Sequence, residues 1–327
     1  MIESITNAGL RTFTSLLTRS KQHARLSILI FHRVLPFPDP IFPGEIHAER
    51  FNSLMEALVK TFNILPLSEA TARLKSGSLP TRSLCITFDD GYRDNAEVAL
   101  PILNRLNIPA TFFVSTSFLD GGCMWNDVVI EAIRNTKKEE LDLTTIGLDH
   151  IPVTNLEQRQ FAIGRVLSEL KYQPQNTRDE NTAIIVEQSA THTPTDLMMR
   201  PEQVQLLAKS GMEIGGHTVT HPILTTLDSG TARSEIADGK QYLEDLTGEK
   251  IMSFAYPNGK PGQDYSSEHV EIVKKLGFST AVSTSWGTST SRSNPFQLPR
   301  FTPWDENTTR FRLRLLQNIL VNKAVTI

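Results

Sequence analysis

Short apolar runs alternate with helical stripes of apolar residues over most of the chain. Residues 26–31, 84–88 and 110–115 are typical of buried strands, because β-branched, aliphatic or aromatic residues follow one another between polar boundaries. Between the last two runs, the spacing of apolar positions predicts a helix over 95–106. A strand, a helix and a strand in close succession form a βαβ unit, so we expect a parallel sheet.

The same alternation also occurs before this unit and resumes in the second half of the chain. Further helices are predicted over residues 51–62, 68–74, 201–210, 231–246, 266–276 and 308–321. Further strands are predicted over residues 212–215, 251–255, 279–283 and 296–301. No Gly-x-Gly-x-x-Gly or P-loop follows any predicted strand, so the pattern favours a (β/α) barrel over a dinucleotide-binding sheet.

Two segments fall outside this rhythm. Residues 120–195 form a polar stretch of mixed charge with helices predicted over 127–134 and 156–170, and we interpret it as an insertion. Residues 2–20 place apolar side chains at near-helical spacing. Such a helix either packs on the domain or touches a membrane surface, and its few basic residues favour packing. We therefore expect an N-terminal helix within 1–25 and one barrel over 26–327, interrupted at about 120–195.

Composition and charge narrow the function classes. The 327 residues carry a formal net charge of -3, which offers no basic face for a nucleic-acid partner. The two cysteines show no CxxC spacing, so neither a disulfide framework nor a thiolate zinc site is expected. We identify no signal peptide and no transmembrane segment, and expect a cytoplasmic location. The composition does not indicate an oligomeric state.

Two adjacent carboxylates follow the second buried run, in Thr87-Phe88-Asp89-Asp90-Gly91. The active groups of barrels lie at the carboxyl ends of the strands. Successive strand residues point to opposite sides, so both acids reach one cleft only if Gly91 turns the chain. One acid could then hold a metal while the other acts as a base. The alternative is a pair of turn-forming aspartates that cap the next helix.

Two histidines follow another strand, in Gly215-Gly216-His217-Thr218-Val219-Thr220-His221-Pro222. A spacing of four in one helical turn would place both imidazoles on the same side, a frequent arrangement for metal ligation. Alone, the pair could equally be exposed or hydrogen-bonded in a loop. Together with Asp from another strand end, two His complete a three-ligand zinc set that leaves one position open for water.

These two motifs together resemble the polysaccharide deacetylase family, the NodB-homology domain of carbohydrate esterase family 4. The resemblance extends to the Ala-Thr-Phe-Phe-Val run at 110–114 and to Phe-Ala-Tyr-Pro-Asn-Gly at 254–259. It covers roughly residues 26–118 and 197–301 and leaves the insertion uncovered.

The resemblance implies a deformed (β/α)₇ barrel that hydrolyses N-acetyl groups from an amino-sugar polysaccharide or its lipid-linked precursor. By the same resemblance, Asp90, His217 and His221 bind Zn²⁺ or another divalent ion, and Asp89 is the catalytic base. It also implies that the backbone N–H of Tyr256 stabilises the oxyanion.

Two departures from the family pattern direct attention to other residues. Ala255 stands where the third motif often has an arginine, and no histidine follows His269 to supply the usual C-terminal acid. His32, in Phe-His-Arg at the end of the first strand, resembles the branch acting on biofilm exopolysaccharides, in which this motif lies at the N-terminus. First and last strands of a closed barrel are neighbours, so His32 can serve as the general acid; the alternative is a structural histidine. Arg300 is the candidate for the arginine that is missing at position 255 and would pair with Asp89. The alternative is an ordinary surface or loop arginine.

Aromatic side chains could stack on a pyranose face. The candidate substrate contacts are Tyr92, Trp125, Pro257, Trp286 and Trp304. The aromatic members are equally plausible as core packing, and Trp125, inside the insertion, is expected to mark specificity.

Three other functions compete with the deacetylase. A catalytically silent polysaccharide-binding module is suggested by Ala255 and the missing C-terminal histidine. A metal-dependent hydrolase of a non-sugar amide would share the metal site. A two-carboxylate glycosidase is disfavoured, because adjacent acids rarely reach the ~5–9.5 Å placement that this chemistry needs.

Overall fold

The computed structural model describes residues 24–302, 308–320 and 325–327. The helix expected at the N-terminus and the candidate Trp304 lie outside these residues, apart from residues 24 and 25 at the end of that expected range. Within them, no helix combines the length and the hydropathy needed to cross a bilayer.

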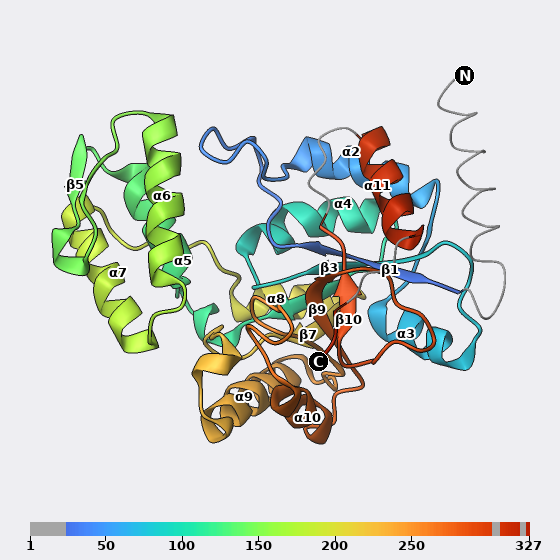
Figure 1. Cartoon of the computed structure of the whole chain (residues 1–327). Coiled ribbons are helices and arrows are strands. Elements are labelled where there is room, and N and C mark those ends of the chain that lie inside the picture. Colours follow the sequence, from blue (N-terminus) through green and yellow to red (C-terminus); the bar gives the residue numbers. More distant parts are fainter. Residues whose placement is uncertain (1–23, 303–307, 321–324) are drawn as a thin grey trace.

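A parallel sheet curls into a nearly closed barrel (Figure 1). Its strands follow the order β1 (Leu26–Phe31), β3 (Ser83–Phe88), β4 (Thr111–Val114), β7 (Glu213–Gly216), β8 (Ser253–Ala255), β9 (Thr280–Trp286) and β10 (Leu298–Arg300), and the short β2 (Asn63–Ile64) pairs with β3. At the seam, Leu29 bridges Phe301 in parallel, and the N–H of Phe301 donates to the carbonyl of Ile28 at 2.8 Å. The predicted (β/α)₇ barrel is confirmed, with its first and last strands side by side.

Helices connect the strands around the outside of the barrel (Figure 1). They are α2 (Ala48–Val59), α3 (Leu67–Ser76), α4 (Leu100–Arg105), α8 (Pro201–Lys209), α9 (Ser229–Thr247), α10 (Ser267–Lys275) and α11 (Thr308–Leu320), with single 3₁₀ turns η3 (Thr116–Phe118) and η5 (Leu224–Thr226). The helix expected over 95–106 differs from the prediction, since it begins as a π-helix, η2 (Asn95–Ala99), before continuing as α4. Single π turns are frequent at functional sites, and this one begins four residues after Gly91 of the carboxylate motif.

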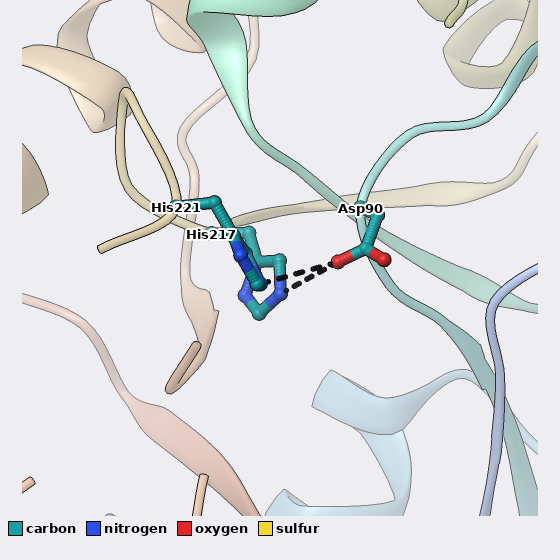
Figure 2. A group of neighbouring side chains, drawn as sticks. All are labelled: Asp90, His217 and His221. Carbon is teal, nitrogen blue, oxygen red and sulfur yellow. Dashed lines mark ion pairs between the residues drawn. The ribbon is translucent and has the colours of Figure 1, made fainter. Parts of the chain in front are cut away.

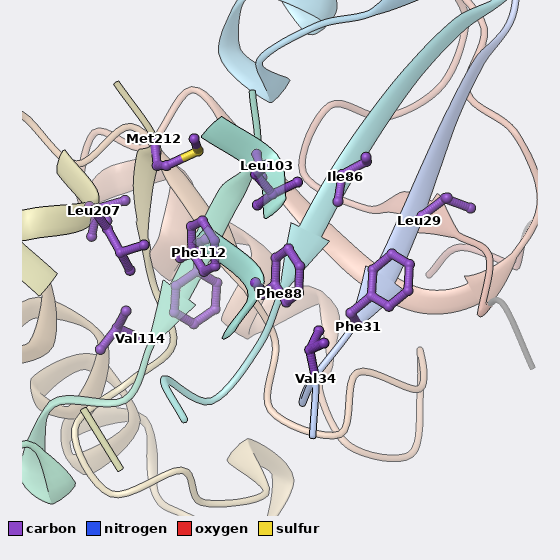
Figure 3. Close-up of a cluster of buried hydrophobic side chains, with 14 of the residues drawn as sticks. Leu29, Phe31, Val34, Ile86, Phe88, Leu103, Phe112, Val114, Leu207 and Met212 are labelled. Atoms are coloured by element: carbon purple, nitrogen blue, oxygen red, sulfur yellow. The ribbon is translucent and has the colours of Figure 1, made fainter. Parts of the chain in front are cut away.

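The main core fills the space between the strands and the surrounding helices. Phe88 stacks on Phe112 at a centroid distance of 4.7 Å and on Phe31 at 5.4 Å, so three neighbouring strands are joined by one aromatic row (Figure 3). Every residue of β1, β3 and β4 is buried, as expected for a parallel sheet covered on both faces. This packing fixes the strand ends that carry the site.

The segment inserted between β4 and α8 has a hydrophobic core of its own and lies beside the barrel (Figure 1). It contains α5 (Trp125–Asn135), β5 (Glu140–Asp142), η4 (Thr144–Ile146), β6 (His150–Pro152), α6 (Leu156–Leu170) and α7 (Gln175–Ser189). The loop after β1 joins this core, because Ile41 is buried in it and Asp39 forms an ion pair with Arg134 at 2.7 Å. The chain that follows His32 is thereby tied to the insertion.

Candidate active site

The two carboxylates lie in a tight turn at the end of β3. The N–H of Asp89 donates to the carbonyl of Phe31 at 2.9 Å, and Asp90 and Gly91 both have positive φ, at 78° and 93°. A Cβ on Gly91 would come within 3.1 Å of the Cγ1 of Val114, so glycine is required by both conformation and space. A positive φ is unfavourable for Asp90, and such strain is typical of functional sites. Both carboxylates line the same cavity, as the turn at Gly91 was predicted to allow.

The two histidines follow β7 in a loop. The predicted helical turn is wrong, because Thr218 and His221 have φ values of 68° and 56°, which a right-handed helix excludes. The loop still brings both imidazoles to one carboxylate (Figure 2). Nε2 of His217 lies 3.2 Å and Nε2 of His221 lies 3.3 Å from Oδ1 of Asp90.

Glu235 on α9 holds this histidine loop from outside the barrel. Its carboxylate accepts hydrogen bonds from the N–H groups of Val219 and Thr220 at 2.9 and 2.8 Å and from the Thr220 hydroxyl at 2.7 Å. Helix and loop approach closely at Gly239, where a Cβ would lie 3.0 Å from the backbone of Thr218. The strained loop is therefore fixed by both hydrogen bonding and packing.

Asp90, His217 and His221 fit a divalent metal ion. One potential ligand atom from each lies within 4.8 Å of the other two. Nδ1 of His217 lies 2.7 Å from the carbonyl of Ala255, so this nitrogen is the donor and Nε2 presents its lone pair to the cluster. Two imidazoles and one carboxylate form a common zinc donor set.

The pKa values of Asp90 and His221 are shifted by burial and by neighbouring charges. Burial by itself raises the pKa of Asp90, but the imidazoles of His221 and His217 hold it well below its usual range. Burial lowers the pKa of His221 to about 4, against the opposing effect of Asp90. Asp90 is therefore anionic and His221 neutral at pH 7, the protonation states that metal ligation requires.

Asp89 is paired with Arg300 rather than with the histidines. The Nη1 and Nη2 atoms of Arg300 donate to the two carboxylate oxygens of Asp89 at 2.6 Å each, and Nε donates to the carbonyl of Ser283 at 3.0 Å. Both side chains are buried. Burial raises the pKa of Asp89, but Arg300 and His217 outweigh it and hold the pKa below its usual range. Asp89 is thus a fixed anion beside the metal ligands.

His32 lies at the carboxyl end of β1 and is exposed on the wall of the same cavity. Its backbone is held from both sides. The Asn95 amide donates to the carbonyl of His32 at 2.8 Å, while Asp94 accepts from Nε of Arg33 at 2.8 Å and from the N–H of Val34 at 2.9 Å. The imidazole is therefore presented from an anchored backbone.

The cavity of about 480 Å³ has one wall from the strand ends and one from the insertion. Of the predicted substrate contacts, Tyr92 and Trp125 line it. Tyr92 is buried, and its hydroxyl donates to Asp127 on α5 at 2.9 Å. Trp125 begins α5 and carries the guanidinium of Arg178 over its ring at 5.0 Å.

Two further predicted contacts among the described residues are not part of the cavity lining. Pro257 and Trp286 do not line it, and Trp286 is exposed beside Phe301. Tyr256 is buried against Tyr265, and its backbone N–H, predicted as the oxyanion donor, donates to the carbonyl of Val282 at 3.3 Å. This N–H is thus engaged within the sheet, and the oxyanion role of Tyr256 stays a prediction.

Several polar residues of the site were not identified from the sequence. Arg33, Asp94 and Asn95 anchor the His32 segment, Asp127 lines the cavity, and Glu235 holds the histidine loop. Asp94 and Asn95 lie three and four residues after Gly91 and were interpreted only as the start of a helix. The sequence does not show that these two side chains are buried. Their burial would have indicated a structural role, because buried polar groups are held by specific partners.

Comparison with known proteins gives a consistent family and fold. A model of the polysaccharide deacetylase family matches residues 76–164 and 175–281. The YxkH protein of Bacillus subtilis strain 168, itself assigned to the polysaccharide deacetylases, is 21% identical over 289 residues, which is 88% of this chain and 74% of the relative.

Solved structures share the fold at low sequence identity. The deacetylase PplD of Streptococcus pyogenes, determined with acetate, is similar with a TM-score of 0.60 and 18% identity, covering 90% of this chain and 98% of PplD. IcaB of Ammonifex degensii has a TM-score of 0.54 and 19% identity, covering 88% of this chain and 97% of IcaB. At these identities the likeness concerns the fold alone.

Proposed function

The chain belongs to the polysaccharide deacetylase family, and we propose that it removes N-acetyl groups from an amino-sugar glycan in a metal-dependent hydrolysis. One observation carries the proposal: the Asp90, His217 and His221 cluster and the Arg300-paired Asp89 face one cavity that also contains His32. A metal site, an anionic base and an imidazole are the groups that amide hydrolysis requires.

We assign the metal position to Asp90, His217 and His221, with Zn²⁺ as the ion that best suits nitrogen and carboxylate ligands. A divalent ion held there supplies Lewis-acid chemistry, which makes water more acidic and polarises the acetyl carbonyl. The protein's contribution is a buried cluster whose His217 is oriented by the carbonyl of Ala255. The acetylated sugar would be a polymer unit or a lipid-linked precursor.

Asp89 is assigned as the general base. It is ionised, because Arg300 holds its pKa below the usual range, and the two hydrogen bonds from Arg300 fix the plane of the carboxylate. It accepts the proton of the attacking water as the water adds to the acetyl carbon. Arg300 acts through Asp89 and is therefore a positioning residue.

His32 is assigned as the general acid. It lines the same cavity as Asp89 and is accessible from the solvent. Its proton passes to the sugar nitrogen as the carbon–nitrogen bond breaks, because an unprotonated amine is a poor leaving group. Acetate and the free amino sugar are then released.

Acetate release from acetylated glycan oligomers tests the proposal. We expect release by the zinc-reconstituted protein and none by the metal-free protein. His32→Ala should lower kcat by about 10²–10⁴-fold while the bound zinc stays at the wild-type level. His192→Ala is the matched control, because His192 is exposed and does not line the cavity.

Three results would contradict the proposal or one of its assignments. Absence of acetate release from every glycan, with and without zinc, would exclude the deacetylase and favour a binding module. Unchanged kcat in His32→Ala would remove His32 from the reaction. Faster release from small non-sugar amides than from glycans would assign the metal site to a different substrate.

A further inference from the structure

Arg178 on α7 is a buried cation that forms no ion pair within the described residues. Its side chain is 7% exposed, yet it lines the active-site cavity. In the described part of the chain, no carboxylate lies within ion-pair distance of its guanidinium, and Nε has no hydrogen-bond partner. Buried charges in proteins are normally paired, so this arrangement requires an explanation.

The contacts that Arg178 does make leave its charge uncompensated. The guanidinium lies 5.0 Å from the ring centre of Trp125, and this cation–π contact is weak compared with the cost of burying an unpaired charge. Burial lowers the pKa of Arg178, and the opposing effect of Asp179 is smaller. Among the described residues, Asp179 therefore compensates this charge only in part.

Two other cations that line the cavity are paired with carboxylates. Arg33 is paired with Asp94, and Arg134 is paired with Asp39. Lys171, just after α6, also lines the cavity; among the described residues it has no ion pair, and its ammonium faces the Tyr172 ring at 5.6 Å. Two cations without carboxylate partners thus come from the same wall.

We propose that Arg178 and Lys171 form a subsite for an oxyanion carried by the glycan, either a uronate carboxylate or a phosphate. A guanidinium presents planar, paired donors that match these oxyanions bidentately, and the ammonium adds a second point charge. This inference rests on the proposed function and deepens it, because it states which class of acetylated glycan the enzyme selects.

The position of Arg178 supports recognition along a sugar chain. Arg178 and Trp125 line the metal-site cavity and also a second cavity of about 490 Å³, which reaches Thr220 beside His221. A glycan that occupied both cavities would pass the Arg178–Trp125 pair. The subsite would therefore read a neighbouring sugar rather than the acetyl group itself.

Equilibrium binding to the full, zinc-loaded protein tests the subsite. The charged probe is a tetrasaccharide of alternating glucuronate and N-acetylglucosamine, and the neutral probe is the N-acetylglucosamine tetramer. We expect calorimetry to show at least tenfold tighter binding of the charged probe, with the difference shrinking in 0.5 M NaCl. N-acetylglucosamine 1-phosphate compared with N-acetylglucosamine shows whether phosphate is preferred over carboxylate.

Three variants identify the residues involved. Arg178→Gln should reduce the charged-to-neutral affinity ratio to near one, and Lys171→Gln should reduce it several-fold. Arg165→Gln is the matched control on the same insertion, because Arg165 pairs with the exposed Asp149 and does not line the cavity. A wild-type ratio near one with both acidic probes, or an unchanged ratio in Arg178→Gln, would overturn the proposal.

Thermal unfolding separates binding from a structural role. Removing an unpaired buried charge should raise the Tm of Arg178→Gln, whereas a large drop would show that Arg178 serves the fold and would overturn its assignment. The affinity ratio does not depend on turnover. A charge preference without acetate release refutes only the deacetylase, and acetate release without a charge preference refutes only the subsite.

Discussion

Arg300 and Asp89, 211 positions apart in the sequence, form a bidentate ion pair inside the barrel. The guanidinium meets both carboxylate oxygens at 2.6 Å, and Nη1 also contacts the Thr87 hydroxyl at 3.2 Å. Arg300, on the last strand, thus provides the arginine partner that Ala255 cannot supply.

Two substitutions of Arg300 should separate its effect on the orientation of Asp89 from its effect on the charge of Asp89. Arg300→Lys keeps a positive charge but loses the planar fork, so we expect kcat/KM to fall on the order of 10²-fold through misplacement of Asp89. Arg300→Gln leaves a buried carboxylate uncompensated and should destabilise the protein by about 3–5 kcal/mol. Activity assays and urea unfolding measure the two effects, and equal activity in Arg300→Lys would show that orientation is unimportant.

Metal binding should stabilise the fold, because the ligands come from the ends of two strands. At a zinc concentration 100 times Kd, the free energy of unfolding should rise by about 2.7 kcal/mol. His217→Ala should abolish this gain while changing the metal-free Tm less. Thermal scans with zinc and with a chelator measure the effect, and a zinc-dependent gain that persists in His217→Ala would place the ion elsewhere.

Glu235 should control metal affinity without contacting the metal. Glu235→Gln weakens the three hydrogen bonds that hold the loop between the histidines, so we expect metal affinity to fall by about 10–100-fold. Competition with a chromogenic chelator measures it. Glu271→Gln, at an exposed position on α10, is the control and should bind metal as the wild type does. Equal affinities in the two variants would remove Glu235 from this role.

Asp127 should make stability depend on pH. Burial raises its pKa to about 7, although the Tyr92 hydroxyl and Arg33 act in the opposite direction. Between its ordinary pKa of 3.8 and about 7, the folded protein binds a proton that the unfolded chain has released. The stability contributed by the protonated carboxyl is therefore complete below pH 3.8 and is lost as the pH rises through about 7.

Asp127→Asn removes this titration while retaining an oxygen to accept from Tyr92. The stability gain of the variant over the wild type should increase from pH 4 to about pH 7 and then level off, measured by chemical unfolding of metal-free protein. Asp120→Asn, at an exposed position, should show no such trend. A gain independent of pH would mean that Asp127 is already ionised when folded.

The barrel was predictable because its strands are continuous apolar runs and its helices carry apolar stripes. β1 (Leu26–Phe31) and α6 (Leu156–Leu170) occur at the predicted bounds. α7 was missed because its buried positions include Arg178, Thr182 and Ser189, so the apolar stripe is absent. The hairpin of β5 and β6 was missed because three-residue strands show too little alternation to detect.

The candidate site was predictable where a short sequence motif includes the functional side chains themselves. Asp90, His217 and His221 were predicted as a cluster from their motifs, although the helical turn expected for the histidines is absent. The partners that anchor them could not be found, because Glu235 and Ala255 meet the histidine loop only through packing of distant segments. The prediction of Trp286 as a substrate contact depended on its residue type alone. An aromatic side chain by itself does not indicate which cavity it faces, and Trp286 is exposed.

The seam between β1 and β10 also sets the order in which the site can mature during synthesis. His32 is made early and Arg300 about 270 residues later, and the barrel closes only when the last strand pairs with the first. Until then, Asp89 has no guanidinium partner. A nascent chain therefore carries the metal-ligand motifs well before Arg300 is available to orient Asp89, so we expect the proposed site to be complete only once the last strand has docked.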